Sequence, residues 1–209
     1  MFTNNGESKN STVIDPAKGT VIATVALGGA PEQAVVDGAG TIYSNLEDTN
    51  EVIALDTRTL KIKSRWPVAP AGEPVAMAMD PKSRRLFVGG RDPRMLVMMN
   101  ADTGKVVGKP FPIGDRTDSN IYEPETGMLA TSTRAGTLHI FHLDSPDKLS
   151  LVETVKTEFG AKTMGLDPKT HNLYLTTADF KPAAKATAKD PEPQPTAIPG
   201  TLRLLIYGR

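Results

Sequence analysis

The chain contains 209 residues, with 24 acidic and 24 basic side chains and no cysteine. A zero net charge provides no field that recruits nucleic acid or an anionic membrane surface. Without cysteine the chain has neither a disulfide nor a thiolate nucleophile. No apolar run approaches the roughly 20 residues of a membrane-spanning helix. The sequence therefore predicts a single domain over residues 1–209, with no nucleic-acid partner and no membrane span.

Short apolar runs separated by turn signals follow one another along the chain, as is typical of strands joined by hairpins. The chain opens inside a repeat, with strands expected at Met1–Asn4, Ser11–Asp15 and Thr20–Ala26. Complete units of four antiparallel strands follow at Gln33–Pro70, Pro74–Ile113 and Thr117–Lys156. The last unit is partial, with strands expected at Thr163–Leu166, Leu173–Thr176 and Thr201–Tyr207.

Two series of landmarks recur with one period. Acidic residues that open tight turns lie 43, 43 and 44 residues apart, at Asp37, Asp80, Glu123 and Asp167. Residues that close apolar runs lie 41, 44 and 42 residues apart, at Asp15, Asp56, Asn100 and His142. A four-stranded repeat of about 43 residues is typical of a β-propeller blade, whereas solenoid repeats are shorter or helical. We therefore predict an all-β propeller with three complete and two partial blades, whose complete blades begin within two residues of Gln33, Val75 and Ser119.

Turn chemistry supports the hairpins. An aspartate that opens a turn accepts hydrogen bonds from the backbone two residues on, and a following proline presets φ near −65°. Gly19, Gly104 and Gly127 fall where such turns need a positive φ. Asn172 is expected to take this place in the last repeat.

A proline-rich insertion interrupts the last blade at Ala178–Gly200, with prolines at positions 182, 191, 193, 195 and 199. Proline cannot donate a hydrogen bond to a strand ladder. We therefore expect an exposed polyproline-like or disordered loop in which no residue pairs into a sheet.

One short pattern recurs in three expected strands, as Ile42-Tyr43-Ser44-Asn45, Leu86-Phe87-Val88-Gly89 and Leu173-Tyr174-Leu175-Thr176. These strands resemble the YVTN-repeat family of β-propellers. Two further stretches resemble the D-x-x-T-G-K-V half of the repeat, Val13–Val25 and Asn100–Val107. The resemblance covers nearly the whole chain. It implies an exported bacterial or archaeal propeller, hence a periplasmic or extracellular location, in a wider fold group that includes lactone hydrolases and the haem d1 propeller of nitrite reductases.

The chain departs from this family in two respects. Met1–Gly6 has neither the basic nor the apolar region of a signal peptide. The chain is also expected to correspond to the C-terminal two-thirds of a family member. Its first blade lacks an innermost strand and its last lacks an outermost strand, so the two cannot merge into one. We expect an open arc or a strained five-bladed ring, with self-association through the edges at Met1–Asn4 and Thr201–Tyr207.

Charged residues gather in the loops that enter the innermost strands and in those that join the second and third strands. In a propeller these loops meet at the axial channel, where a mixed-charge mouth can bind a small polar ligand, a cation or a protein partner. The candidate ligand-binding residues are Glu32, Asn45, Glu47, Asp48, Glu73, Arg91, Asp118, Arg134 and Lys162.

Carboxylate and amide oxygens suit Ca²⁺ or Mg²⁺. The best group for either cation is Asn45, Glu47 and Asp48 together with Glu32, although it lacks the Asp-x-Asp-x-Asp-Gly spacing of a calcium loop. No other cofactor is expected. His139 and His142 lie three residues apart on one strand, so they point to opposite faces and do not chelate together.

The sequence contains no Gly-x-Ser-x-Gly nucleophile elbow, and no residue is assigned a catalytic role. It favours a non-enzymatic binding module that uses the channel and rim loops. The alternative is a lactonase-like hydrolase with a channel-centred site, with or without a divalent metal, for which the candidates are Glu32, Arg91, Asp118 and Arg134.

Overall fold

The computed structural model of the chain describes residues 1–185, 187 and 193–208. The regular structure of these residues consists of β-strands and one short 3-10 helix, η1 (Glu47–Thr49). None of them belongs to a helix with the length and apolar character needed to cross a membrane. The predicted all-β fold class is confirmed.

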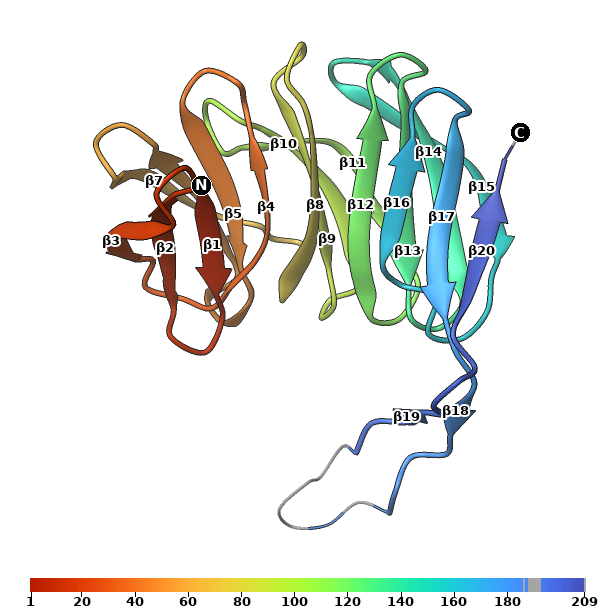
Figure 1. Cartoon of the computed structure of the whole chain (residues 1–209). Coiled ribbons are helices and arrows are strands. Elements are labelled where there is room, and N and C mark those ends of the chain that lie inside the picture. Colours follow the sequence, from red (N-terminus) through yellow and green to blue (C-terminus); the bar gives the residue numbers. More distant parts are fainter. Residues whose placement is uncertain (186, 188–192, 209) are drawn as a thin grey trace.

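Antiparallel sheets of three or four strands follow one another along the chain (Figure 1). The first sheet contains β1 (Phe2–Asn5), β2 (Asn10–Asp15) and β3 (Thr20–Ala26). The second contains β4 (Pro31–Val36), β5 (Thr41–Leu46), β6 (Glu51–Asp56) and β7 (Lys61–Pro67). The third contains β8 (Pro74–Asp80), β9 (Arg85–Gly90), β10 (Met95–Asn100) and β11 (Val106–Pro112). The fourth contains β12 (Thr117–Glu123), β13 (Met128–Thr133), β14 (Thr137–Ser145) and β15 (Lys148–Lys156). The fifth contains β16 (Met164–Asp167), β17 (Asn172–Thr177) and β20 (Arg203–Tyr207).

Within each sheet the strands lie in sequence order, apart from the insertion between β17 and β20. The complete sheets begin at Pro31, Pro74 and Thr117, so the predicted starts are confirmed to within two residues. Each of these five sheets is therefore one blade, built from a meander of neighbouring strands.

The blades stand side by side in an arc, with the first and the last blade at opposite ends (Figure 1). No sheet in the described part of the chain combines strands from both ends. Of the two expected forms, the structure is the open arc. One edge of β1 and one edge of β20 consequently have no neighbouring strand within the described chain.

Local hydrogen bonds fix the turns between strands. The Asp56 carboxylate accepts hydrogen bonds from the N–H groups of Arg58 at 3.0 Å and Thr59 at 2.7 Å. Gly19 and Gly127 have φ values of 64° and 69°, as expected. In the last repeat the positive φ falls on His171, at 58°, so its assignment to Asn172 is wrong. The turn closes one residue earlier because β17 already begins at Asn172.

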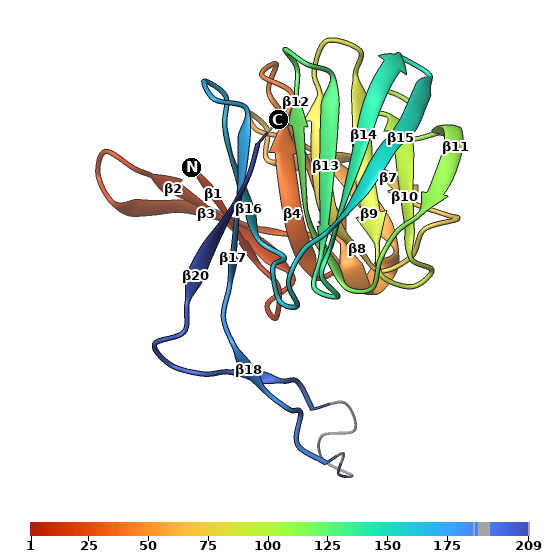
Figure 2. The same cartoon turned by 90° about the vertical axis from the view of Figure 1, so that its right-hand side faces the viewer.

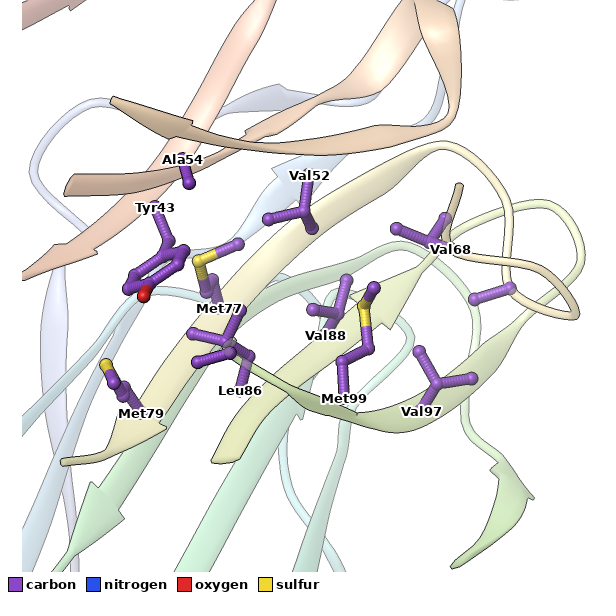
Figure 3. Packing of buried hydrophobic residues seen from close by; sticks show 12 residues of the cluster. Tyr43, Val52, Ala54, Val68, Met77, Met79, Leu86, Val88, Val97 and Met99 are labelled. Carbon is purple, nitrogen blue, oxygen red and sulfur yellow. The ribbon is translucent and has the colours of Figure 1, made fainter. Parts of the chain in front are cut away.

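Apolar side chains fill the space between neighbouring blades. Between the second and third blades the buried cluster contains Tyr43, Val52, Met77, Leu86 and Met99 (Figure 3). Between the third and fourth blades a second cluster contains Phe87, Leu96, Met98, Leu129 and Phe141. These clusters between blades form the core of the arc.

One polar contact recurs between blades. In the second and fourth blades, the side chain at the fifth position of the second strand reaches the backbone of the next blade, within its innermost strand or just before it. The Asn45 amide donates to the Ala76 carbonyl at 3.2 Å, and the Ser132 hydroxyl donates to the Lys162 carbonyl. Asn4, at the equivalent place in the first blade, donates to the Glu32 carbonyl at 2.8 Å.

The insertion contains a two-stranded ribbon that projects away from the blades (Figure 2). β18 (Phe180–Lys181) pairs with β19 (Thr196–Ala197), so the expectation that nothing in the insertion pairs is wrong. Neither paired stretch contains proline, and Phe180 packs edge-on against Phe159 at 5.1 Å between ring centroids. Pro191 lies outside the described residues.

Candidate functional site

Five of the nine predicted candidates converge on one side of the arc. We call this group the charged mouth; it comprises Glu32, Glu47, Arg91, Asp118 and Lys162. They come from four successive blades, because each lies at the start of an innermost strand or in a loop between second and third strands. These strand starts and loops all lie on the same side of the arc (Figure 1).

Arg91 is the central cation of the charged mouth. Its guanidinium donates to the Glu47 carboxylate at 2.8 Å and to the Thr117 carbonyl at 3.1 Å. It also lies 3.7 Å from the Asp118 carboxylate. Arg91 therefore links the second, third and fourth blades through one side chain.

Asp118 carries the network to the last blade. Its carboxylate accepts a hydrogen bond from the Lys162 ammonium at 2.7 Å and one from the Thr163 hydroxyl at 3.3 Å. The Asp118 side chain is only 18% exposed, whereas that of Lys162 is 42% exposed. The charged mouth is thus partly open to solvent along its length.

Glu32 and Glu47 form a carboxyl pair at the other end of the charged mouth. Burial is the largest cause that raises the pKa of Glu32 above its ordinary value of 4.5, followed by repulsion from Glu47. Arg91 partly offsets this increase, while Asp118 adds to it. The pair therefore favours holding a proton or meeting a cation, because two adjacent carboxylates repel one another.

Replacing Glu32 with glutamine is expected to change how stability depends on pH. Since the folded protein binds the Glu32 proton more tightly than the unfolded chain, wild-type stability declines as pH rises from about 4.5 through the raised pKa. Glu32→Gln removes this decline. The melting temperature of the variant minus that of the wild type should increase as pH rises from 4 to 8. A difference that does not change with pH would contradict the raised pKa of Glu32.

Asn45 and Asp48 lie outside the charged mouth. Asn45 is 0% exposed and its amide joins two blades through the Ala76 carbonyl. Asp48 pairs with Lys9 at 2.6 Å and accepts the Ala30 N–H at 2.6 Å, two contacts that lower its pKa. Both side chains are therefore engaged in holding neighbouring blades together.

The side chains of Glu73 and Arg134 form no hydrogen bond or ion pair with the five described residues of the charged mouth, although the Glu73 carbonyl accepts the Arg91 N–H at 3.1 Å. Glu73 is an exposed turn residue with a φ of 46°, and its N–H donates to the Asn50 side chain at 2.6 Å. Arg134 lies over the ring of Phe159, 5.5 Å from its centroid, and donates to Gln194 of the insertion at 2.6 Å. Arg134 thus anchors the insertion to the fourth blade.

The expected calcium or magnesium group does not assemble. Asn45, Asp48 and Glu47 point to different partners, because each is used in a separate contact between blades. Among residues 1–185, 187 and 193–208 no three Asp, Glu or His side chains are arranged to hold a metal ion. Only the carboxyl pair of Glu32 and Glu47 comes together.

Gln33 and Thr163 contribute to this region although they were not among the predicted residues. Gln33 accepts the Met77 N–H at 2.8 Å and the Asn120 N–H at 3.4 Å, so it bridges three innermost strands. It lines a broad hollow on the inner side of the arc, about 740 Å³ in volume. Their position in the sequence could have identified them, because Gln33 directly follows the candidate Glu32 and Thr163 directly follows the candidate Lys162.

Comparison with known proteins gives the fold and no family. No protein-family model and no curated protein sequence matches the chain. A chain in the structure titled Kuenenia stuttgartiensis hydrazine synthase is similar with a TM-score of 0.63 and 15% identity, over 71% of this chain and 42% of that one. A chain in the structure titled mitotic checkpoint complex is similar with a TM-score of 0.72 and 19% identity, over 83% and 56%. The chain spans about half the length of these solved chains. At such identities the likeness establishes a β-propeller-like fold alone.

Proposed function

We propose that the chain is a non-enzymatic binding module whose charged mouth holds a small polar ligand that carries a cationic group. The observation that carries the proposal is the convergence of five charged side chains from four blades on one side of the arc. Three carboxyl groups face two cationic groups there. One negative charge is therefore left without a cation, and a ligand ammonium group compensates it at the Glu32–Glu47 pair.

The resemblance to YVTN repeats belongs to the same proposal. It is supported by Asn45, the asparagine of the repeat motif, which joins its blade to the next. Because the resemblance implies an exported protein, the proposal places the chain in the periplasm or outside the cell.

The binding test is calorimetric titration with a panel of small polar ammonium compounds, including lysine, putrescine and choline. Glu47→Gln is expected to weaken binding by about tenfold or more, because it removes a charged partner of the ligand. Glu73→Gln is the matched control, since Glu73 is exposed and its carboxylate forms no hydrogen bond or ion pair with the described residues of the charged mouth. Equal loss in both variants, or no binding by the wild type, contradicts the proposal.

Two further arms separate the competing interpretations. Calcium and magnesium chloride are titrated alone, and saturable binding that Glu47→Gln abolishes would identify the cationic ligand as a metal ion. A panel of lactones is assayed for hydrolysis, and turnover that the same substitution abolishes would make the module a hydrolase. A binding module predicts no turnover in either protein.

A second copy of the chain is the second candidate partner. The specific observation is β20, which lacks a neighbour on one edge and exposes Leu204 and Ile206 by 55% and 59%, next to Leu202, which is 76% exposed. An apolar edge strand without lysine, proline or a bulge pairs readily with another chain. We expect light scattering to show a dimer for the wild type and a monomer for Leu204→Glu. A wild type that stays monomeric at high concentration contradicts this pairing.

A further inference from the structure

One position of the repeat carries an aromatic ring in every blade except the fourth. The strand registers place Phe2, Tyr43, Phe87 and Tyr174 at the same point of the second strand, opposite Val13, Ala54, Met98 and Ile206. In the fourth blade this point is Ala130, opposite Ile140. The fourth blade therefore lacks a ring where its neighbours on both sides have one.

In the complete neighbouring blades this ring fills the interface with the next blade. Tyr43 is buried between the second and third blades and lies toward Met77 and Met79 of the third blade (Figure 3). Phe87 is buried between the third and fourth blades, with its ring centroid 5.1 Å from that of Tyr122. Both interfaces are closed by buried clusters as a result.

The interface between the fourth and fifth blades is hollow instead. Ala130 borders a cavity of about 230 Å³, whose apolar walls include Ile121, Leu138, Ile140, Val155, Leu173 and Tyr207. These residues belong to strands of the fourth and the fifth blade. The cavity thus occupies the space that an aromatic side chain fills in the preceding interfaces.

Two acidic side chains give the cavity a polar border. The buried Glu123 is already used, because its carboxylate bonds to the His171 ring at 2.7 Å and to the Thr126 hydroxyl at 2.5 Å. Glu153 is exposed at the border and has no ion pair or hydrogen bond from its carboxylate to any described residue. A free carboxylate therefore lies beside an apolar space of aromatic size.

We propose that this cavity binds a small aromatic amine. The aromatic ring takes the place of the side chain that Ala130 lacks, and the ammonium group pairs with Glu153. Binding pockets of this kind combine apolar walls with few polar groups that orient the ligand. The site is separate from the charged mouth, so it goes beyond the binding function proposed above.

The test uses 2-phenylethylamine as the probe, with calorimetry and amide chemical shifts as readouts. We expect saturable binding by the wild type, with shifts confined to the walls of the cavity. Ala130→Phe restores the repeat and fills the cavity, so it should weaken binding at least about tenfold and raise the melting temperature by a few degrees. Ala26→Phe adds the same ring at an exposed site and should leave binding unchanged.

Neutral and ringless analogues separate the two parts of the ligand. 2-Phenylethanol should bind more weakly than the amine, and ethylamine should not bind. Glu153→Gln should reduce the affinity for the amine to about that for the alcohol, whereas Glu73→Gln, at an exposed residue outside the cavity lining, should have no effect. Should Ala130→Phe fail to fold, Ala130→Leu serves as the filling variant.

Three results would overturn the proposal. They are no binding by the wild type at millimolar probe, unchanged binding by a folded variant with the cavity filled, and shifts that map to the charged mouth. An amine affinity that Glu153→Gln leaves unchanged would overturn the assignment of the ammonium group.

Discussion

Replacing Asn45 with aspartate is expected to destabilise the protein by about 3–5 kcal/mol at neutral pH, as unpaired buried charges do. Asn45 is 0% exposed, and its amide donates to the Ala76 carbonyl at 3.2 Å. An ionised aspartate has no proton to donate there, and its charge has no cationic partner in the packed interface. Chemical denaturation at pH 7 measures the loss.

The loss at Asn45→Asp should shrink as pH falls. Burial raises the pKa of a carboxyl group, so the side chain becomes neutral in the folded protein at a pH where it is still charged in the unfolded chain. The control is Asn100→Asp, because Asn100 only accepts N–H groups in a turn and the equivalent turns use Asp15 and Asp56. That control should change stability by less than about 0.5 kcal/mol. A loss at Asn45→Asp that does not vary with pH contradicts a buried charge.

Replacing Phe87 with alanine is expected to cost about 3–5 kcal/mol, the usual range for removing a buried aromatic ring. Phe87 is 0% exposed and packs in the cluster that joins the third and fourth blades. The substitution opens there the kind of hollow that already exists beside Ala130. Urea denaturation with wild type and variant in parallel gives the difference in the free energy of unfolding.

Val36→Ala is the control for Phe87→Ala, since Val36 is 63% exposed and its truncation opens no cavity. It should cost less than about 0.5 kcal/mol. A Phe87→Ala loss below 1.5 kcal/mol (about the smallest value expected for a fully buried apolar side chain) would mean that the two blades move together and close the hollow.

The blade boundaries could be predicted from the sequence because they depend on contacts within a few residues. The carboxylates of Asp56 and Asp80 each accept hydrogen bonds from the N–H groups two and three residues later. A turn of this kind is therefore specified by residues that are close together in the sequence. Alternating strands and turns then repeat with one period, which is sufficient to identify a propeller blade. The ribbon at Phe180 could not be predicted in this way, because β18 pairs with β19 at the other end of the insertion and not with a neighbouring segment.

The candidate site could be predicted only in part. Position in the repeat placed Glu32, Asp118 and Lys162 at the same end of the innermost strands, and the structure brings them into one charged mouth. Asn45 was predicted to lie in a channel loop, but it lies in β5, where every residue is buried. Because β5 has no alternation of buried and exposed residues, its sequence does not show which side chains face the channel. Whether such a polar residue faces the channel or the next blade depends on how the blades pack.

The sequence by itself determined the strands, their order and the period of the repeat, since hydrogen bonds between neighbouring segments specify them. Only the tertiary structure decided which charges meet and where space is left. Ala130 is visible in the sequence as a missing aromatic residue, but a missing ring leaves a cavity only when the surrounding blades do not close in. Whether the cavity stays open depends on side chains from two blades, among them Ile121 and Tyr207. No local sequence pattern indicates the distance between such residues.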